Sequence, residues 1–300
     1  MTLRRTETPH RHAKGLQAMP PRIILARLLE GQQEAAAAVA AALPALEAAA
    51  QLAAEALGAG RRLGYAGAGS SGLMALADAL ELAGTFGFAP DRTPVLFAGG
   101  AQALLAMTGA VEDDDAAALR DLEASGLAAG DALICVSASG TTPYTLAAAR
   151  AARERGLVTI GVANAEGAPL LTLCDRPVLL DTGPELVAGS TRMGAATAQK
   201  IALNMISTLA GLLLGHVHDG QMVNVIADNA KLRDRARRIV AQVAGVPPEA
   251  AAEALTAAEG AVKPAVLVAA GVSDPAEALR LLAAHEGHLG PALATLRGAS

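Results

Sequence analysis

The chain has 300 residues, of which 52% are hydrophobic, so it can bury a large core in one domain and still carry smaller additions. Its formal net charge of -5 provides no basic field, and its aromatic content of 2% provides no stacking platform, so we expect no nucleic-acid partner. Alanine, leucine and valine must supply most of the packing, which favours helices that approach one another closely.

The first part of the chain combines an irregular arm with alanine-rich helices. Residues 1–20 have mixed charge and several prolines, which predicts an extended arm without a signal peptide. The pattern from Ile23 to Leu57 is helical, with a break near Pro44. Alanine is only weakly apolar and polar residues interrupt this run, so we predict no membrane partner and a cytoplasmic protein.

Five short apolar runs follow, and each ends in glycine or polar residues. They alternate with helical patterns, which predicts an α/β fold with a doubly wound, five-stranded parallel sheet. The predicted strands are Leu63–Ala66, Val95–Ala98, Ala132–Ser137, Val158–Ala163 and Val178–Leu180.

Long helical patterns close the sheet region and lead into a small helical tail. We predict helices over Val187–Leu214 and Met222–Val243, and a boundary at Val246-Pro247-Pro248. Three short helical patterns follow, at about 249–259, 262–270 and 275–284, and they are too few to make a core alone. The predicted domains are therefore residues 1–58, 59–245 and 246–300.

Two hydroxyl-rich turns follow predicted strands, and ligands bind at the carboxyl ends of the strands in such sheets. We name them the Gly69 turn, Gly69–Gly72, and the Ser137 turn, Ser137–Thr142. Hydroxyls and free N–H groups at helix N-termini suit a phosphate monoester, although Ser and Thr are also ordinary helix caps. Two such turns at one sheet edge favour a phosphate site. Neither turn matches the dinucleotide or nucleoside-triphosphate motifs.

Two glutamates near these turns are candidates for acid/base work. Glu81 follows the Gly69 turn among Ala79, Leu80 and Leu82, where burial would raise its pKa as a general acid requires. Glu112 opens an acidic run, and a solvated face or helix start is the simpler explanation of the next three residues, Asp113–Asp115.

The histidines and cysteines do not form a recognisable metal motif. His216 and His218 lack a third ligand at a suitable spacing, so we interpret them as loop or interface residues and predict no metal. Cys135 and Cys174 lie in apolar surroundings, where buried free thiols are expected rather than a disulfide.

Taken together, the motifs resemble those of the N-acetylmuramic acid 6-phosphate etherases, which belong to the sugar isomerase (SIS) domain superfamily. The resemblance covers nearly the whole chain. Its motifs are GYAGAGSSG, DALELAGTFG, LFAGG, EDDD, SASGTTPY, DTGPELVAGSTRMGAATAQKIALNMIS and DNAKLRDRARRIV.

The resemblance implies a cofactor-independent lyase that cuts the lactyl ether of N-acetylmuramic acid 6-phosphate during cell-wall recycling. The family's catalytic glutamates match Glu81 and Glu112. It also implies a sugar-phosphate site whose residues are Ser70, Ser71, Ser137, Ser139, Thr142, Ser190, Thr191 and Lys231.

This chain differs from the family at several positions. Leu73 and Thr141 replace arginines, Gly194 replaces a lysine, and Ala83-Gly84 replaces a Pro-Pro pair. If those cations normally face substrate anions, either Arg192, Lys200 or Lys231 replaces them, or this chain binds a less anionic sugar.

Two other functions share the same fold. An aldose-ketose isomerase also needs a carboxylate but no acid aimed at a leaving group on C3, and a regulatory sugar-phosphate sensor needs neither glutamate. SIS domains commonly pair, so a homodimer is expected, with the alanine-rich helices and N-terminal arm as its surface.

Overall fold

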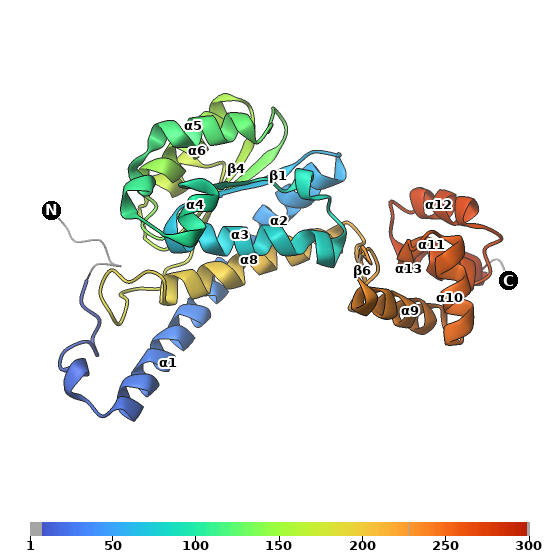
Figure 1. Cartoon of the computed structure of the whole chain (residues 1–300), viewed down its shortest axis with the longest axis horizontal. Helices are drawn as coiled ribbons and strands as arrows, with labels where there is room; N and C mark the ends of the chain where they lie inside the picture. Colours follow the sequence, from blue (N-terminus) through green and yellow to red (C-terminus); the bar gives the residue numbers. More distant parts are fainter. Residues whose placement is uncertain (1–7, 228, 299–300) are drawn as a thin grey trace. The chain divides into compact units, whose positions relative to one another are not determined.

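We describe the protein from a computed structural model. The structure describes residues 8–227 and 229–298, which form a parallel sheet, a short hairpin and many helices (Figure 1). In chain order the elements are η2 Leu16–Ala18, α1 Pro21–Ala38, η3 Val39–Ala42, α2 Leu43–Gly58, β1 Leu63–Gly67, α3 Gly69–Phe86, η4 Pro90–Arg92, β2 Val95–Phe97, α4 Gly100–Leu105, η5 Gly109–Asp113, α5 Asp115–Ala124, β3 Ala132–Val136, α6 Pro143–Glu154, β4 Val158–Ala163, α7 Pro169–Leu173, β5 Arg176–Leu179, α8 Gly194–Leu213, β6 Val217–His218, β7 Gln221–Met222, α9 Ala230–Ala244, α10 Pro248–Ala257, α11 Val262–Ala269, α12 Pro275–Ala284 and α13 Leu289–Gly298.

The chain divides into two compact units. The first contains the described parts of residues 1–80 and 91–207, and the second contains residues 81–90 and the described parts of 208–300. α3 and α8 each begin in the first unit and end in the second. The predicted domain boundaries after residues 58 and 245 stay a prediction.

The first unit is built on the five-stranded sheet. Its strand order is β2-β1-β3-β4-β5, and every neighbouring pair is parallel. α5 and α6 lie against one face, and α3 and α8 lie against the other (Figure 1). The predicted α/β class and doubly wound parallel sheet are therefore confirmed, and the strands begin and end within two residues of their predicted bounds.

Glycines allow β1 to turn directly into α3. A Cβ atom added to Gly72 would lie 2.9 Å from the carbonyl carbon of Gly67 and 2.8 Å from the ring of Phe97, closer than real Cβ contacts. The helix therefore begins inside the motif, at Gly69, because the backbone needs the space that side chains would fill.

The helical stretch Pro21–Gly58 is long and apolar enough to cross a membrane by length and composition alone. In the structure η3 interrupts it immediately before Pro44, close to the predicted break. α2 buries Leu46, Ala53 and Leu57 and packs on β1, β3 and β5, which accounts for its apolar composition. The absence of a membrane partner stays a prediction.

Two helices begin later than predicted. α8 begins at Gly194 rather than Val187, because the chain before it forms turns that include Gly189 at a φ of +75°. α9 begins at Ala230 rather than Met222, because β6 and β7 form an antiparallel hairpin there. The apolar residues in the segments before α8 and α9 have a spacing that resembles that of a helix, which is why the helices were predicted to begin too early.

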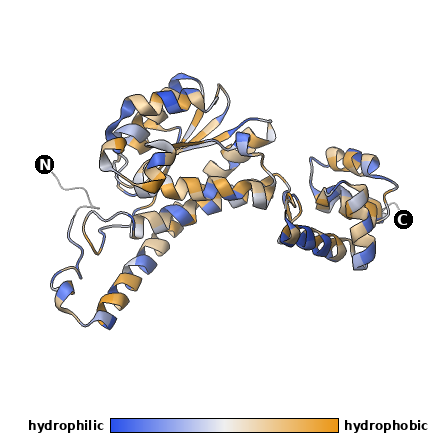
Figure 2. Ribbon diagram, viewed as in Figure 1, coloured by the Kyte–Doolittle hydropathy of each residue, from blue (hydrophilic) through white to orange (hydrophobic). Residues whose placement is uncertain are grey.

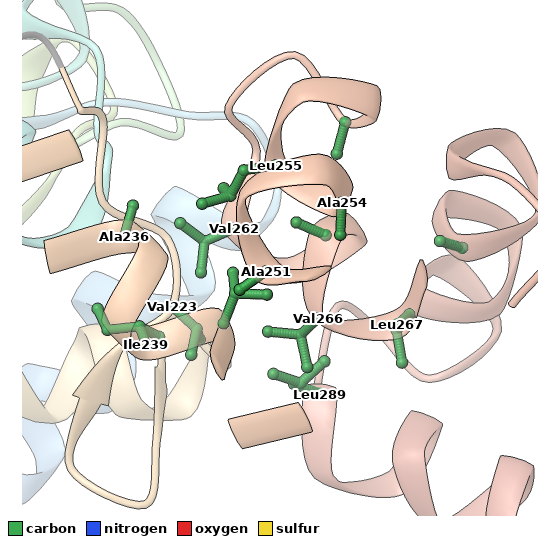
Figure 3. Packing of buried hydrophobic residues seen from close by; sticks show 14 of the residues in the cluster. Val223, Ala236, Ile239, Ala251, Ala254, Leu255, Val262, Val266, Leu267 and Leu289 are labelled. Atoms are coloured by element: carbon green, nitrogen blue, oxygen red, sulfur yellow. The ribbon is translucent and has the colours of Figure 1, made fainter. Parts of the chain in front are cut away.

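The second unit has its own hydrophobic core, shown in Figure 3. α9 contributes Ala236 and Ile239, which face Ala251 of α10 and Val262 of α11. The tail predicted as too small for a core therefore shares one with α9, which carries many strongly hydrophilic residues (Figure 2). A fourth tail helix, α13, was not predicted.

Candidate active site

The two hydroxyl turns lie side by side because β1 and β3 are neighbours in the sheet. The backbone N–H of Ala138 donates to Ser71 Oγ at 3.2 Å, and Ser71 is buried. Ser70, its neighbour at the start of α3, is half-buried. The predicted meeting of the turns at one sheet edge is confirmed, and a direct hydrogen bond joins them.

The Ser137 turn is held by its own hydroxyl groups. Ser137 Oγ lies 2.8 Å from Thr142 Oγ1 and accepts the N–H of Gly140 at 3.0 Å. Ser139 Oγ accepts from both the N–H and the hydroxyl of Thr141, at 3.2 and 3.0 Å. Ser139 and Thr142 remain half-buried, so both hydroxyls can reach a ligand.

Capping alone does not explain the Ser137 turn. Thr142 is the N-cap of α6, yet its side chain makes no capping hydrogen bond. The first turn of α6 therefore keeps its positive end without a side-chain acceptor, next to several hydroxyls. This is an arrangement that favours a bound anion such as a phosphate.

Glu112 lies directly against the Gly69 turn. Its Oε1 would be 2.6 Å from a Cβ atom placed on Gly69, whose φ is +52°. Burial, and then the neighbouring charge of Asp113, raise the pKa of the Glu112 carboxyl. A carboxyl group with a raised pKa beside a hydroxyl-rich turn suits proton transfer.

The rest of the acidic run has the simpler role that was expected. Asp114 is the N-cap of α5, and its Oδ1 accepts the N–H of Ala117 at 2.8 Å. Asp113 and Asp115 are exposed. The first carboxylate of the run, Glu112, lies against the Gly69 turn.

The prediction that Glu81 is buried is wrong. Ala79 and Leu82 are buried on one face of α3, whereas Leu80 is 69% exposed and Glu81 is also exposed. Successive helical residues point about 100° apart, so apolar neighbours in sequence do not bury a side chain between them. Glu81 belongs to the second unit, and its pairing with Glu112 stays a prediction.

Three other predicted binding residues lie away from the two turns in sequence. Ser190 and Thr191 are half-buried in the connection before α8, rather than inside a helix as predicted. Lys231 is exposed on the first turn of α9, in the second unit. Their contact with substrate stays a prediction.

Glu185 is a structural residue that the sequence did not reveal. It is 5% exposed, and its two carboxylate oxygens accept the N–H groups of Gly194 at 2.9 Å and Ala195 at 2.8 Å. A loop carboxylate thus caps α8 from outside the helix. The Gly-Pro-Glu motif marked this position, but nothing in its spacing pointed to a cap nine residues ahead.

A second buried carboxylate, Asp78, joins three elements of the first unit. Tyr65 of β1 donates to its Oδ2 at 2.8 Å, and Asn204 and Ser207 of α8 donate to its Oδ1 at 2.6 and 3.0 Å. Burial raises the pKa of Asp78 more strongly than these hydrogen bonds lower it. This network fixes α3, which carries the Gly69 turn, against β1 and α8.

A third network fixes the loops at the ends of β4 and β5. Asn164 is fully buried after β4 and donates to the carbonyl oxygen of Leu180 at 3.2 Å. Gln199 of α8 donates to Asn164 Oδ1 at 2.8 Å. Gln199 belongs to one of the family motifs, but the motif did not indicate its partner, and Asn164 lies outside every motif quoted above.

The described residues contain no group of three or more His, Cys, Asp or Glu side chains placed to hold a metal ion. The expectation of no metal stays a prediction.

Cys135 and Cys174 are both buried and free, as predicted. His216 packs its ring against Phe88, with ring centroids 4.9 Å apart.

Comparison with known proteins gives consistent relatives over almost the whole chain. A model of the SIS domain matches residues 30–164. The phosphoheptose isomerase GmhA from Neisseria gonorrhoeae is a similar solved structure, with 21% identity and a TM-score of 0.47 over 64% of this chain and 98% of that one.

Two curated relatives are much closer in sequence. The N-acetylmuramic acid 6-phosphate etherase of Deinococcus radiodurans is 46% identical over 285 residues, which are 95% of this chain and 93% of that protein. The N-acetylmuramic acid 6-phosphate etherase of Streptomyces avermitilis is 42% identical over 275 residues, covering 91% and 88%. At this identity and coverage, the chain belongs to the N-acetylmuramic acid 6-phosphate etherase family.

Proposed function

We propose that the protein is a carbon-oxygen lyase that converts N-acetylmuramic acid 6-phosphate and water to N-acetylglucosamine 6-phosphate and D-lactate. The observation that carries this proposal is the Glu112 carboxyl group, with its raised pKa, lying against the Gly69 turn. The Ser137 turn, bonded to the Gly69 turn through Ser71, supplies hydroxyls for the phosphate. The names of the relatives supply the substrate.

The elimination needs two proton transfers on one sugar. Ring opening exposes an aldehyde at C1, which acidifies the proton on C2. A carboxylate removes that proton, and lactate leaves from C3 with a proton from an acid, because an alkoxide leaves poorly. Water then adds across the C2–C3 double bond: its oxygen bonds to C3 as a base takes one of its protons, and an acid returns a proton to C2. The bond that breaks is C3–O, so the ether oxygen departs with lactate.

Two glutamates share this work in our proposal. Glu81 acts as acid and base at the elimination and hydration, and Glu112 serves ring opening or the second proton transfer. The raised pKa of Glu112 supports a proton-transfer role, because a higher pKa helps a carboxyl group to donate a proton as well as accept one. No step in this scheme requires a cofactor.

The phosphate is held, we propose, at the carboxyl ends of β1 and β3. Ser70, Ser139 and Thr142 are only half-buried there and can donate to it. Ser71 and Ser137 are buried and hold the two turns in place. Ser190, Thr191 and Lys231 are assigned to the rest of the substrate on the family resemblance alone.

We further propose a cytoplasmic homodimer that acts in peptidoglycan recycling. α1 supports a partner surface: it buries only Ala35, while Leu25 and Leu29 are 66% and 59% exposed. An apolar helix surface of this kind commonly marks an interaction site. Light scattering at micromolar concentrations should give the dimer mass, and a constant monomer mass would contradict this assembly.

The central experiment follows lactate and the sugar product in H₂¹⁸O without added metal or nucleotide. We expect D-lactate without ¹⁸O and N-acetylglucosamine 6-phosphate with ¹⁸O at C3. The aldehyde at C1 exchanges oxygen with water by itself, so the product is returned to ordinary water before its mass is measured. N-acetylglucosamine 6-phosphate alone serves as the exchange control.

Variants then test the two glutamates. Glu81→Gln and Glu112→Gln should each lower the rate about 10²- to 10⁴-fold if the carboxyl groups transfer protons. Glu123→Gln, at an exposed position of α5, is the matched control and should leave the rate unchanged. If the folded wild-type protein releases no lactate, the proposed lyase activity is wrong. Conversion of an aldose phosphate to a ketose phosphate would then favour the isomerase.

A further inference from the structure

The second unit contains a cavity of 570 Å³ that the proposed reaction does not use. The segment 223–227, the turn before α11, the start of α11 and part of α12 line it. Most of its wall is apolar, with Val225, Pro264 and Leu282 among the lining residues. Its size is within the range of pockets that bind small molecules.

One buried cation, Lys263, lines this cavity. Its exposed fraction is 8%, whereas Lys14, Lys200 and Lys231, the other lysines of the chain, are exposed. Within the described residues, its Nζ has one hydrogen-bond partner, the carbonyl oxygen of Gly287 at 2.9 Å. An ammonium group has three N–H donors, so two remain for another acceptor.

The charge of Lys263 is poorly compensated. Burial lowers the pKa of Lys263 to about 8, so the ammonium form still predominates at pH 7. Glu259 is the acidic residue that lines the same cavity, but it is exposed and forms no ion pair with Lys263 in the described structure. A buried ammonium group without a carboxylate partner is costly, and a bound anion would offset that cost.

The start of α11 adds backbone hydrogen-bond donors to the same wall of the cavity. Ala261 is the N-cap of this helix and makes no side-chain capping bond. The N–H groups of Val262 and Lys263 find no acceptor among the described residues, and both residues line the cavity. The positive end of the helix and the ammonium group of Lys263 therefore favour the same sign of ligand charge.

We propose that this cavity binds a small monocarboxylate, with its carboxylate against Lys263 Nζ and its hydrocarbon body against Val225, Pro264 and Leu282. A single ammonium group, with no arginine among the lining residues, suits one negative charge better than a phosphate dianion. The apolar wall gives the hydrocarbon part a place out of water. This site is independent of the proposed lyase activity.

Saturation-transfer NMR on the full chain tests the site with hexanoate as the probe. We expect strong transfer to hexanoate, and at least tenfold weaker transfer to hexanol, which has the same body without the charge. Sulfate, which has charge without the body, should fail to displace hexanoate. D-lactate is tested as a competitor, because displacement by it would identify the reaction product as a ligand of this site.

Lys263→Gln is the decisive variant, because an amide can still donate to the Gly287 carbonyl oxygen but carries no charge. Saturation transfer to hexanoate should be at least tenfold weaker in this variant, while the matched exposed variant Lys14→Gln should keep the wild-type signal. Circular dichroism verifies that both variants fold. No transfer in the wild type up to 20-fold molar excess over 1 mM protein, or equal transfer in both variants, would overturn the proposal.

If Lys263→Gln does not fold, reductive methylation of the wild type replaces it. Hexanoate should slow the modification of Lys263 with formaldehyde and cyanoborohydride at least fivefold, and Lys14, Lys200 and Lys231 in the same sample serve as internal controls. Equal protection of all four lysines, or none, would also overturn the proposal.

Discussion

Gly69 decides how closely the Glu112 carboxyl group approaches the start of α3. Its positive φ already favours glycine, and any side chain there would collide with Glu112 Oε1. The same contact takes Glu112 partly out of water, which raises its pKa, and Asp113 adds a like charge. Gly69 therefore leaves room for a candidate catalytic group whose pKa burial and Asp113 raise.

Asp113→Asn tests the electrostatic part of this arrangement. It removes the like charge that raises the pKa of Glu112, so that pKa should fall. The limb of the kcat/KM pH profile that reports Glu112 should shift to lower pH. Asp115→Asn, at the exposed start of α5, is the control and should shift the limb less. A profile unchanged in Asp113→Asn would argue that Glu112 does not control this limb.

Ser71→Ala tests the bond between the two turns. The substitution leaves the buried N–H of Ala138 without its acceptor, which should reduce the free energy of unfolding by about 1–2 kcal/mol. Because the turns hold the phosphate in our proposal, KM should rise more than kcat falls. Urea denaturation and initial rates measure the two effects, and a change in kcat alone would contradict a binding role.

At the scale of elements, α8 depends on a cap from a distant loop. Glu185 holds two N–H groups at the helix start, where the helix dipole also favours a negative charge. This bond explains why the helix begins at Gly194 and not within the apolar residues before it. A predicted helix over Val187–Leu214 was wrong at its start because periodicity does not detect such long-range caps.

Glu185→Ala should therefore destabilise the protein by about 2–3 kcal/mol in free energy of unfolding, since two buried donors lose their acceptor. Glu185→Gln keeps one acceptor oxygen and should lose about half as much. Glu123→Ala, exposed on α5, should change stability by less than about 0.5 kcal/mol. The midpoints of urea denaturation measure the stability of all three variants. Midpoints equal to that of the wild type in all three would contradict the proposed cap.

At the scale of the whole molecule, the chain forms two units with separate cores. The sheet unit carries both hydroxyl turns and Glu112, whereas the second unit carries α9, the tail helices and the cavity at Lys263. α9 and the tail helices contribute to one core, which extends across Val246-Pro247-Pro248, and the predicted domain bounds stay a prediction.

The buried lysine predicts how this unit responds to pH. The pKa of Lys263 is about 8 in the folded protein and about 10.5 in the unfolded chain, so the unfolded state binds more protons between these values. Stability from this group therefore rises as pH increases from 8 to 10.5, by roughly 3 kcal/mol. Lys263→Met lacks this titration.

The measurement is the difference in free energy of unfolding between wild type and Lys263→Met, by urea denaturation at several pH values. Other titrating groups cancel in that difference. The free energy of unfolding of the wild type should increase relative to that of the variant as the pH rises toward 10.5. A constant difference would mean that Lys263 has an ordinary pKa in the folded protein.

The sequence by itself determined the α/β class, the five strands, the two hydroxyl turns and the family, because strand runs, glycine turns and motifs are local features. Glu112 could also be selected from a motif. Its raised pKa could not, because that depends on the approach of Gly69 and on burial.

The exposure of Glu81, the cap by Glu185 and the network around Asp78 were decided only by the tertiary structure. The partners of Glu185 and Asp78 lie on other elements, and the exposure of Glu81 depends on which face of α3 meets solvent. The residues adjacent in sequence indicate neither of these. Burial and long-range hydrogen bonds depend on how elements pack, so they arise only when the chain has folded.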